Sequence, residues 1–194
     1  SFFGIADYNY DNRYFVQATI REDGSSLFGA KNKWGLFWSG SASWNIHSES
    51  WMNDATFLDM LKLRASYGLN GNNGISPYKA FGVYSTTQYA GVVGMLPSQP
   101  SNDYLSWEKN ATWNIGIDFG FLNRIRGNLD VYERVTKDML LSKKVPQTSG
   151  FSSNFMNAGS MKNTGVELQL EGDIIATSDM LWTVGANFAI NRTE

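Results

Sequence analysis

The sequence predicts an all-β protein, an antiparallel up-and-down β-barrel that crosses a membrane. Apolar and polar residues alternate with a period of two through several segments of about ten residues. The connections between these segments are alternately short and long. Charged residues make up only 18% of the 194 residues, below the roughly 25% of average globular proteins, while aromatic residues reach 14%. The surface of such a chain differs from that of an ordinary soluble protein.

The alternation is clearest in residues 36–47, where Trp38 and Trp44 have one parity and Ser41 and Ser43 have the other. Successive side chains of a strand point to opposite sides, so this segment has one apolar and one polar face. The same pattern occurs in residues 61–70, 112–121 and 182–191, and more weakly in 1–9, 14–21, 127–141 and 165–172. We expect about eight strands, several of them with the roughly 9–11 residues that a tilted membrane-spanning strand needs.

The connections favour a membrane barrel over a sandwich. Residues 10–12, 122–126 and 174–179 are short connections, whereas 23–33, 71–106 and 142–160 are long. Outer-membrane barrels have short periplasmic turns and long extracellular loops. The connection 48–60 is of intermediate length, and we expect a helical turn in it, with Asp54 as the cap of Phe57 and Leu58.

Aromatic residues are expected at both ends of these strands, as in the girdles that mark the two membrane interfaces. The long-loop ends carry Trp34, Trp38 and Trp107, and the short-loop ends carry Trp44, Phe119, Phe121 and Trp182.

Composition excludes several other classes of protein. The chain has no cysteine, a single histidine and a formal net charge of −2, which argues against disulfides, a multi-histidine metal site and nucleic-acid binding. His47 is the only candidate base for a serine nucleophile, and neither a nucleophile elbow nor a phosphate-binding loop occurs. We expect no catalysis and no cofactor.

Two groups of residues are candidates for a binding function. The first would point into the barrel lumen from the polar parity of the strands: Arg64, Asn114, Asp118, Glu167 and Gln169. The second lies in the longest loop: Tyr78, Phe81, Tyr84 and Tyr89. Loop aromatics can stack on sugar rings, pack against a partner protein, or pack on one another to stiffen the loop.

Several segments resemble the barrel of SusC/RagA-type TonB-dependent outer-membrane transporters. They follow one another in order along nearly the whole chain: 12–29, 34–40, 61–68, 70–74, 107–116 and 163–167. The resemblance implies that residues 1–194 form part of an integral outer-membrane barrel of about 22 strands, with the plug domain and the TonB box not recognisable in this chain. It further implies import of oligosaccharides or peptides, powered through TonB, with a SusD-like surface lipoprotein as partner and outer-membrane lipid around the wall.

Two other architectures fit the strand pattern. One is a complete small outer-membrane barrel of eight strands, which its own side chains could fill. The other is a soluble β-sandwich that binds carbohydrate through exposed aromatic residues. In the small barrel the first and last strands would pair with each other, unlike in a part of a larger barrel. In the β-sandwich a second sheet would cover the apolar face.

Overall fold

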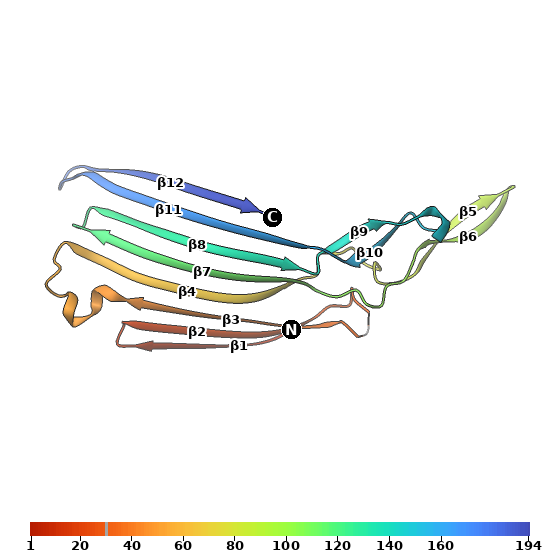
Figure 1. The fold of residues 1–194 in the computed structure, drawn as a ribbon, viewed down its shortest axis with the longest axis horizontal. Helices are drawn as coiled ribbons and strands as arrows, with labels where there is room; N and C mark the ends of the chain where they lie inside the picture. The colour runs from red at the N-terminus through yellow and green to blue at the C-terminus, as the bar shows by residue number, and fades with distance from the viewer. Residues whose placement is uncertain (30) are drawn as a thin grey trace.

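A computed structural model describes residues 1–29 and 31–194 and contains one large antiparallel sheet (Figure 1). Its eight strands lie side by side in the order in which they occur in the chain. They are β1 (Phe2–Tyr10), β2 (Tyr14–Gly24), β3 (Trp34–Asn45), β4 (Leu58–Asn72), β7 (Glu108–Phe121), β8 (Ile125–Lys137), β11 (Ser160–Ala176) and β12 (Leu181–Thr193). The expected up-and-down order and the expected strand positions are confirmed.

The sheet is open, with β1 and β12 as its edges. Its apolar face is exposed, as Trp38 at 47% and Phe188 at 57% show. Among the described residues no second sheet covers that face, so the β-sandwich alternative is wrong. The closed eight-stranded alternative is also wrong, because the eight-stranded sheet does not pair β1 with β12.

Two further hairpins occupy segments that the sequence analysis treated as loops. Strands β5 (Val83–Tyr89) and β6 (Val92–Gln99) form one, and β9 (Leu140–Lys144) and β10 (Ser153–Asn157) form the other. Figure 1 shows both beyond the long-loop end of the sheet. Asp138, with a φ of 56°, separates β8 from β9, which explains why the alternation blurs within residues 127–141.

The helical turn expected at Asp54 is wrong. Three-residue 3-10 turns lie earlier in this connection, η1 (Ile46–Ser48) and η2 (Ser50–Met52), and β4 already begins at Leu58. The Phe57 ring stacks on Phe121 at 6.5 Å, and the Phe57 carbonyl accepts a hydrogen bond from the Leu122 amide. These contacts fix Phe57 against the end of β7, and the chain enters β4 directly after it.

The third 3-10 turn is η3 (Gln147–Ser149), in the β9–β10 hairpin. Every helix in the described part of the chain is too short to cross a membrane.

The strand registers sort the side chains onto two faces. Trp38 pairs with Ile20 on one side and with Leu69 on the other, so apolar residues meet apolar residues across the sheet. We call this the apolar face; it includes Ala18, Ile20, Leu36, Trp38, Ala42, Leu63, Ala65, Leu69, Ile115, Ile117, Leu129, Val131, Val166, Leu168, Phe188 and Ile190. The opposite, polar face includes Asp7, Gln17, Ser39, Ser41, Ser43, Lys62, Arg64, Ser66, Asn114, Asp118, Asn128, Asp130, Glu167, Gln169 and Asn187.

Aromatic residues mark both ends of the apolar face, as expected. Near the long loops, Trp38 contacts Tyr67 with ring centroids 5.4 Å apart. Near the short turns, Trp44 stacks on Tyr14 at 6.1 Å. Trp38 and Trp44 are six residues apart on one strand, which corresponds to about 20 Å. This spacing is close to the height of the apolar band of outer-membrane barrels, roughly 25 Å.

The buried hydrophobic core lies at the long-loop end of the large sheet, where Phe37 of β3 meets residues of the long loops. Its buried members are Phe28, Phe37, Ile75, Ala80, Leu105 and Trp107. Trp107 was expected in the outer aromatic girdle, and that expectation is wrong. It is only 7% exposed, packs edge-on against Phe37, and donates its indole N–H to the Lys33 carbonyl. This core joins the β2–β3 and β4–β7 connections into one unit.

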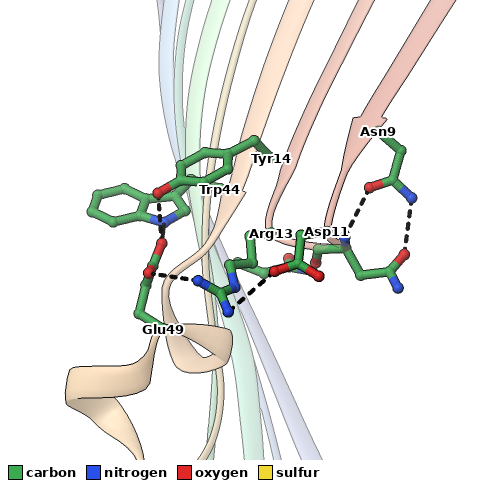
Figure 2. Close-up of polar contacts among 8 residues, drawn as sticks. Asn9, Asp11, Arg13, Tyr14, Trp44 and Glu49 are labelled. Carbon is green, nitrogen blue, oxygen red and sulfur yellow. Dashed lines mark hydrogen bonds and ion pairs between the residues drawn. The ribbon is translucent and has the colours of Figure 1, made fainter.

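A buried carboxylate fixes the short-turn end of the apolar face (Figure 2). Glu49, 8% exposed, accepts hydrogen bonds from the Tyr14 hydroxyl at 2.6 Å and the Trp44 indole N–H at 2.9 Å. Arg13 lies 3.5 Å from the same carboxylate and 3.1 Å from Asp11. The hydrogen bonds from Tyr14 and then Trp44, together with the charge of Arg13, lower the pKa of Glu49, although burial opposes the shift.

We expect Glu49→Gln to lower the resistance of the folded protein to urea at pH 7. A carboxyl group with a lowered pKa in the folded state stabilises the fold above the ordinary glutamate pKa of about 4.3, and this stabilisation disappears as the pH falls through the lowered value. The variant and the parent should therefore converge in acid. Unfolding midpoints from tryptophan fluorescence at pH 7 and pH 3 measure this difference. Glu22→Gln, at the exposed far end of β2, is the control and should leave both midpoints unchanged.

Candidate functional site on the polar face

All five residues predicted to face a lumen lie on the polar face. Arg64 is on β4, Asn114 and Asp118 are on β7, and Glu167 and Gln169 are on β11. The strand alternation alone places them there, since each occupies the parity opposite to the apolar residues of its strand.

An ion network joins three strands at the middle of this face. The Arg64 guanidinium donates through Nε and Nη2 to the Asp118 carboxylate, at 2.8–3.0 Å. Its Nη2 also lies 3.0 Å from Asp130 on β8. The forked guanidinium matches a carboxylate in two parallel hydrogen bonds, which are stronger than neutral ones. Arg64 therefore holds two carboxylates of neighbouring strands in fixed positions.

Gly116 provides the space in which this network forms. It lies opposite both Arg64 and Asp130 in the strand registers. A Cβ atom at this position would be 2.5 Å from Asp130 Oδ1 and 2.7 Å from Arg64 Nη2. Any side chain at Gly116 would push the arginine away from one of its carboxylates.

Glu167 and Gln169 belong to a second, more acidic part of the face. Gln169 donates to Glu171 at 3.2 Å, and Arg126 bridges Glu171 at 2.8 Å and Asp173 at 3.4 Å. Glu167 lies opposite Asp130 in the register. It lines a hollow of about 430 Å³ with Asn128, Asp130, Gln169 and Asn187. Arg64 and Glu167 thus line different hollows of the same wall.

The larger hollow, of about 480 Å³, lies over β1 to β4 and β7. Its polar lining includes Asp7, Asn9, Gln17, Ser41, Ser43, Lys62, Arg64, Ser66 and Asn114. Amide, hydroxyl and charged groups of both signs can exchange hydrogen bonds with a polar solute. In the described part of the chain no cluster of His, Asp and Glu is placed to hold a metal ion. These residues can therefore bind a polar solute through reversible hydrogen bonds and ionic contacts.

The predicted loop aromatics lie in and before the β5–β6 hairpin. Tyr84 and Tyr89 are 63% and 86% exposed and, five residues apart on β5, point to opposite sides of the hairpin. Tyr78 and Phe81 precede the hairpin and are also exposed. None of the ring pairs found in the described residues joins two of these four, so they do not stiffen the loop by packing on one another.

The base of this hairpin is firmly attached to the loop core. The Gln99 side-chain amide donates to the carbonyls of Tyr78 and Phe81, each at 2.8 Å. The Asn102 side chain donates to the Phe155 carbonyl at 2.8 Å and so reaches the second hairpin. The exposed aromatics therefore extend from a rigid support.

Sequence comparison identifies the architecture to which this site belongs. The family model described as "TonB dependent receptor-like, beta-barrel" matches residues 1–194. The chain belongs to the TonB-dependent receptor β-barrel family. The eight-stranded sheet is therefore part of a barrel wall, and its apolar and polar faces are the two sides of that wall.

Two curated relatives match this TonB-dependent receptor chain along its whole length. TonB-dependent receptor SusC of Bacteroides thetaiotaomicron is 39% identical over 204 residues, and TonB-dependent receptor P39 of Formosa agariphila is 36% identical over 196 residues. The chain covers 20% and 19% of these relatives, about one fifth of their length.

Among solved structures, the RagAB peptide importer in its "closed-closed" state matches with a TM-score of 0.92 and 36% identity over 99% of this chain and 21% of that one. The "open-open" state of the same importer gives a TM-score of 0.90 over the same shares. These relatives are receptors and importers rather than enzymes, in agreement with the lack of a catalytic set in the sequence.

Sequence analysis missed Asp130, the second carboxylate of the Arg64 network. Its strand was recognised only at its start, because the alternation blurs towards the turn at Asp138. The signal was present nevertheless. Counting by twos from the polar Asn128 leads to Asp130 and then to Tyr132, all on the polar face.

We expect Gly116→Ala to break the Arg64–Asp130 contact and destabilise the barrel by about 1.5–3 kcal/mol, the usual contribution of a hydrogen bond to a charged group. The measurement is the urea midpoint of unfolding in detergent. Gly172→Ala is the matched control, since no atom lies within 4 Å of a Cβ at Gly172. Equal midpoints for the two variants would show that the network needs no space at Gly116.

Proposed function

We propose that this chain forms part of the wall and the extracellular mouth of an outer-membrane importer for peptides or oligosaccharides. One observation carries the proposal: through the seven consecutive strands from β2 to β12 of the large sheet, one face is predominantly apolar and the opposite face is predominantly polar. A wall between lipid and water needs this division. The exposed apolar face would contact acyl chains, and the polar face would line the aqueous lumen.

The polar face suits the passage of a hydrophilic solute. Arg64, Asp118 and the surrounding amides and hydroxyls offer donors and acceptors, and the two hollows are open to solvent and lined mainly by polar residues. Such contacts can form and break quickly, as transport requires. The peptide alternative is supported by the RagAB importer, and the oligosaccharide alternative by the resemblance to the SusC/RagA type.

A SusD-like surface lipoprotein is the proposed partner at the mouth. The β5–β6 hairpin exposes Tyr84, Tyr89 and Met95, and residues 80–102 contain no charged side chain. A two-stranded hairpin is only marginally stable by itself, and a contact with a partner would bury its apolar side chains. TonB would act through a plug domain, an element not found among the described residues of this chain.

The orientation of the wall can be tested by cysteine labelling, because this chain has no cysteine of its own. We expect a cysteine at Ser41 or Asn114 to react with a charged, water-soluble thiol reagent in cells. A cysteine at Ile117 or Phe188 should resist it and give a spin label that collides with oxygen in the bilayer. The measurements are the labelled fraction and the spin-label accessibility of the full-length protein in its membrane.

The reverse outcome, with Ile117 and Phe188 reactive and Ser41 and Asn114 protected, would overturn the proposed function. Unreactive cysteines on both faces would also contradict it, because an aqueous lumen must admit the reagent.

The role of the hairpin can be tested by replacing residues 84–98 with a short Gly-Ser linker, which keeps the Gln99 contacts at the base of the hairpin. The barrel should still fold, because the hairpin makes its own two-stranded sheet. We expect the amount of lipoprotein that copurifies with the barrel to fall at least tenfold, which corresponds to about 1.4 kcal/mol. A matched linker replacing residues 145–152, in the second hairpin, is the control. Undiminished copurification would place the partner contact elsewhere.

A further inference from the structure

A group of cations lies at the long-loop end of the apolar face. It consists of Lys109 on β7, Lys137 on β8, Lys162 on β11 and Arg192 on β12. Thr136, the neighbour of Lys137, is buried and bonds to Asn110 on the opposite side, so Lys137 points to the apolar side of the sheet. The strand registers place the other three on that side as well. We call these four residues the outer cationic cluster.

The centre of the cluster is a pair of like charges. Lys109 and Lys137 lie directly opposite each other in the β7–β8 register. Like charges in this position destabilise a sheet. Asp138 approaches Lys109 only to 4.0 Å, and within residues 1–29 and 31–194 Lys137 forms no ion pair. Asp138 thus offsets the charge of Lys109 only weakly, and the charge of Lys137 has no acidic partner within this part of the protein.

The other two cations have acidic neighbours but stay accessible. Lys162 lies 2.6 Å from Glu133, and Arg192 lies 2.9 Å from Glu194. The side chain of Lys162 is 46% exposed and that of Arg192 is 77% exposed. Three acidic groups therefore face four basic ones, which leaves one excess positive charge at the Lys109–Lys137 pair.

We propose that the outer cationic cluster binds the phosphate group of a lipid in the outer leaflet, with Lys109 and Lys137 on either side of the phosphate. This inference rests on the proposed function, which places the apolar face in the bilayer. Ile115 and Val131, further along the same strands, continue the apolar face towards the short turns. A lipid can lay its acyl chains on these residues while its phosphate bridges the two ammonium groups.

The geometry favours a lipid over a free anion. Long lysine side chains lie along apolar surface and carry their charge to the headgroup level. A phosphate between two ammonium groups converts their repulsion into two charge-assisted hydrogen bonds. A free phosphate gains only these bonds and competes with water and salt, whereas a lipid also gains the apolar contact below them.

The test uses the full-length protein in detergent, with phosphorylated lipid A as probe and the same lipid after removal of its phosphate as comparison. Native mass spectrometry measures the bound lipid. We expect the parent to bind the phosphorylated form about tenfold more tightly, and Lys109→Ser with Lys137→Ser to remove this preference. Lys143→Ser with Lys144→Ser, on the exposed strand β9, is the control and should keep it.

Three results would overturn the inference. They are an unchanged preference in the Lys109/Lys137 variant, an equal loss in the control variant, and equally strong displacement by inorganic phosphate, which would indicate a site for a free anion. Cysteine labelling at Ser41 and Ile117 in the same variant keeps the two proposals apart. Normal labelling with no lipid preference refutes the lipid site alone, while reversed labelling refutes the proposed function.

Discussion

The pairing of backbone amides and carbonyls between neighbouring strands is the constraint on which this structure depends. Inside a bilayer no water satisfies an unpaired peptide group, so a sheet in lipid must bond along the whole length of each strand. The registers from β1 to β12 do so through the middle of the sheet, with shifts only at Leu58–Met60 and Asp173–Ile175, near the short turns. The β3–β4 pairing covers Trp38–Asn45 and stops before the long-loop end of β3. The backbone amides and carbonyls at the exposed edges of β1 and β12 likewise require neighbouring strands to pair with.

Because the backbone groups are paired within the sheet, the side chains alone determine which face is apolar and which is polar. The apolar face needs no interior packing, and for this reason most of its large side chains are exposed in the described sheet. Charged residues in mid-sheet are confined to the polar face, where Arg64 can serve two carboxylates because Gly116 leaves room for it. Charges reappear on the apolar face only near its outer end, at Lys162 and its neighbours.

The sheet could be predicted from the sequence because its period is exact and its strands are long. Residues 36–47 show the two parities so clearly that Trp38 and Ser41 could be placed on opposite faces without coordinates. The β5–β6 hairpin could not be predicted, because its strands carry no alternation: residues 85–88 are all polar, and the apolar Val92 and Val93 are adjacent. Trp107 was misplaced because its burial depends on contacts between segments far apart in the sequence, with Phe28 in the β2–β3 connection and Phe37 on β3.

The loop core has a consequence for how this protein can diversify. Phe28, Phe37, Leu105 and Trp107 anchor the long loops independently of what the hairpin tip carries. Residues between Val83 and Gln99 pair only with one another, so their side chains can change without disturbing any strand of the wall. Substitutions in this hairpin can therefore accumulate while the eight strands of the wall keep their register.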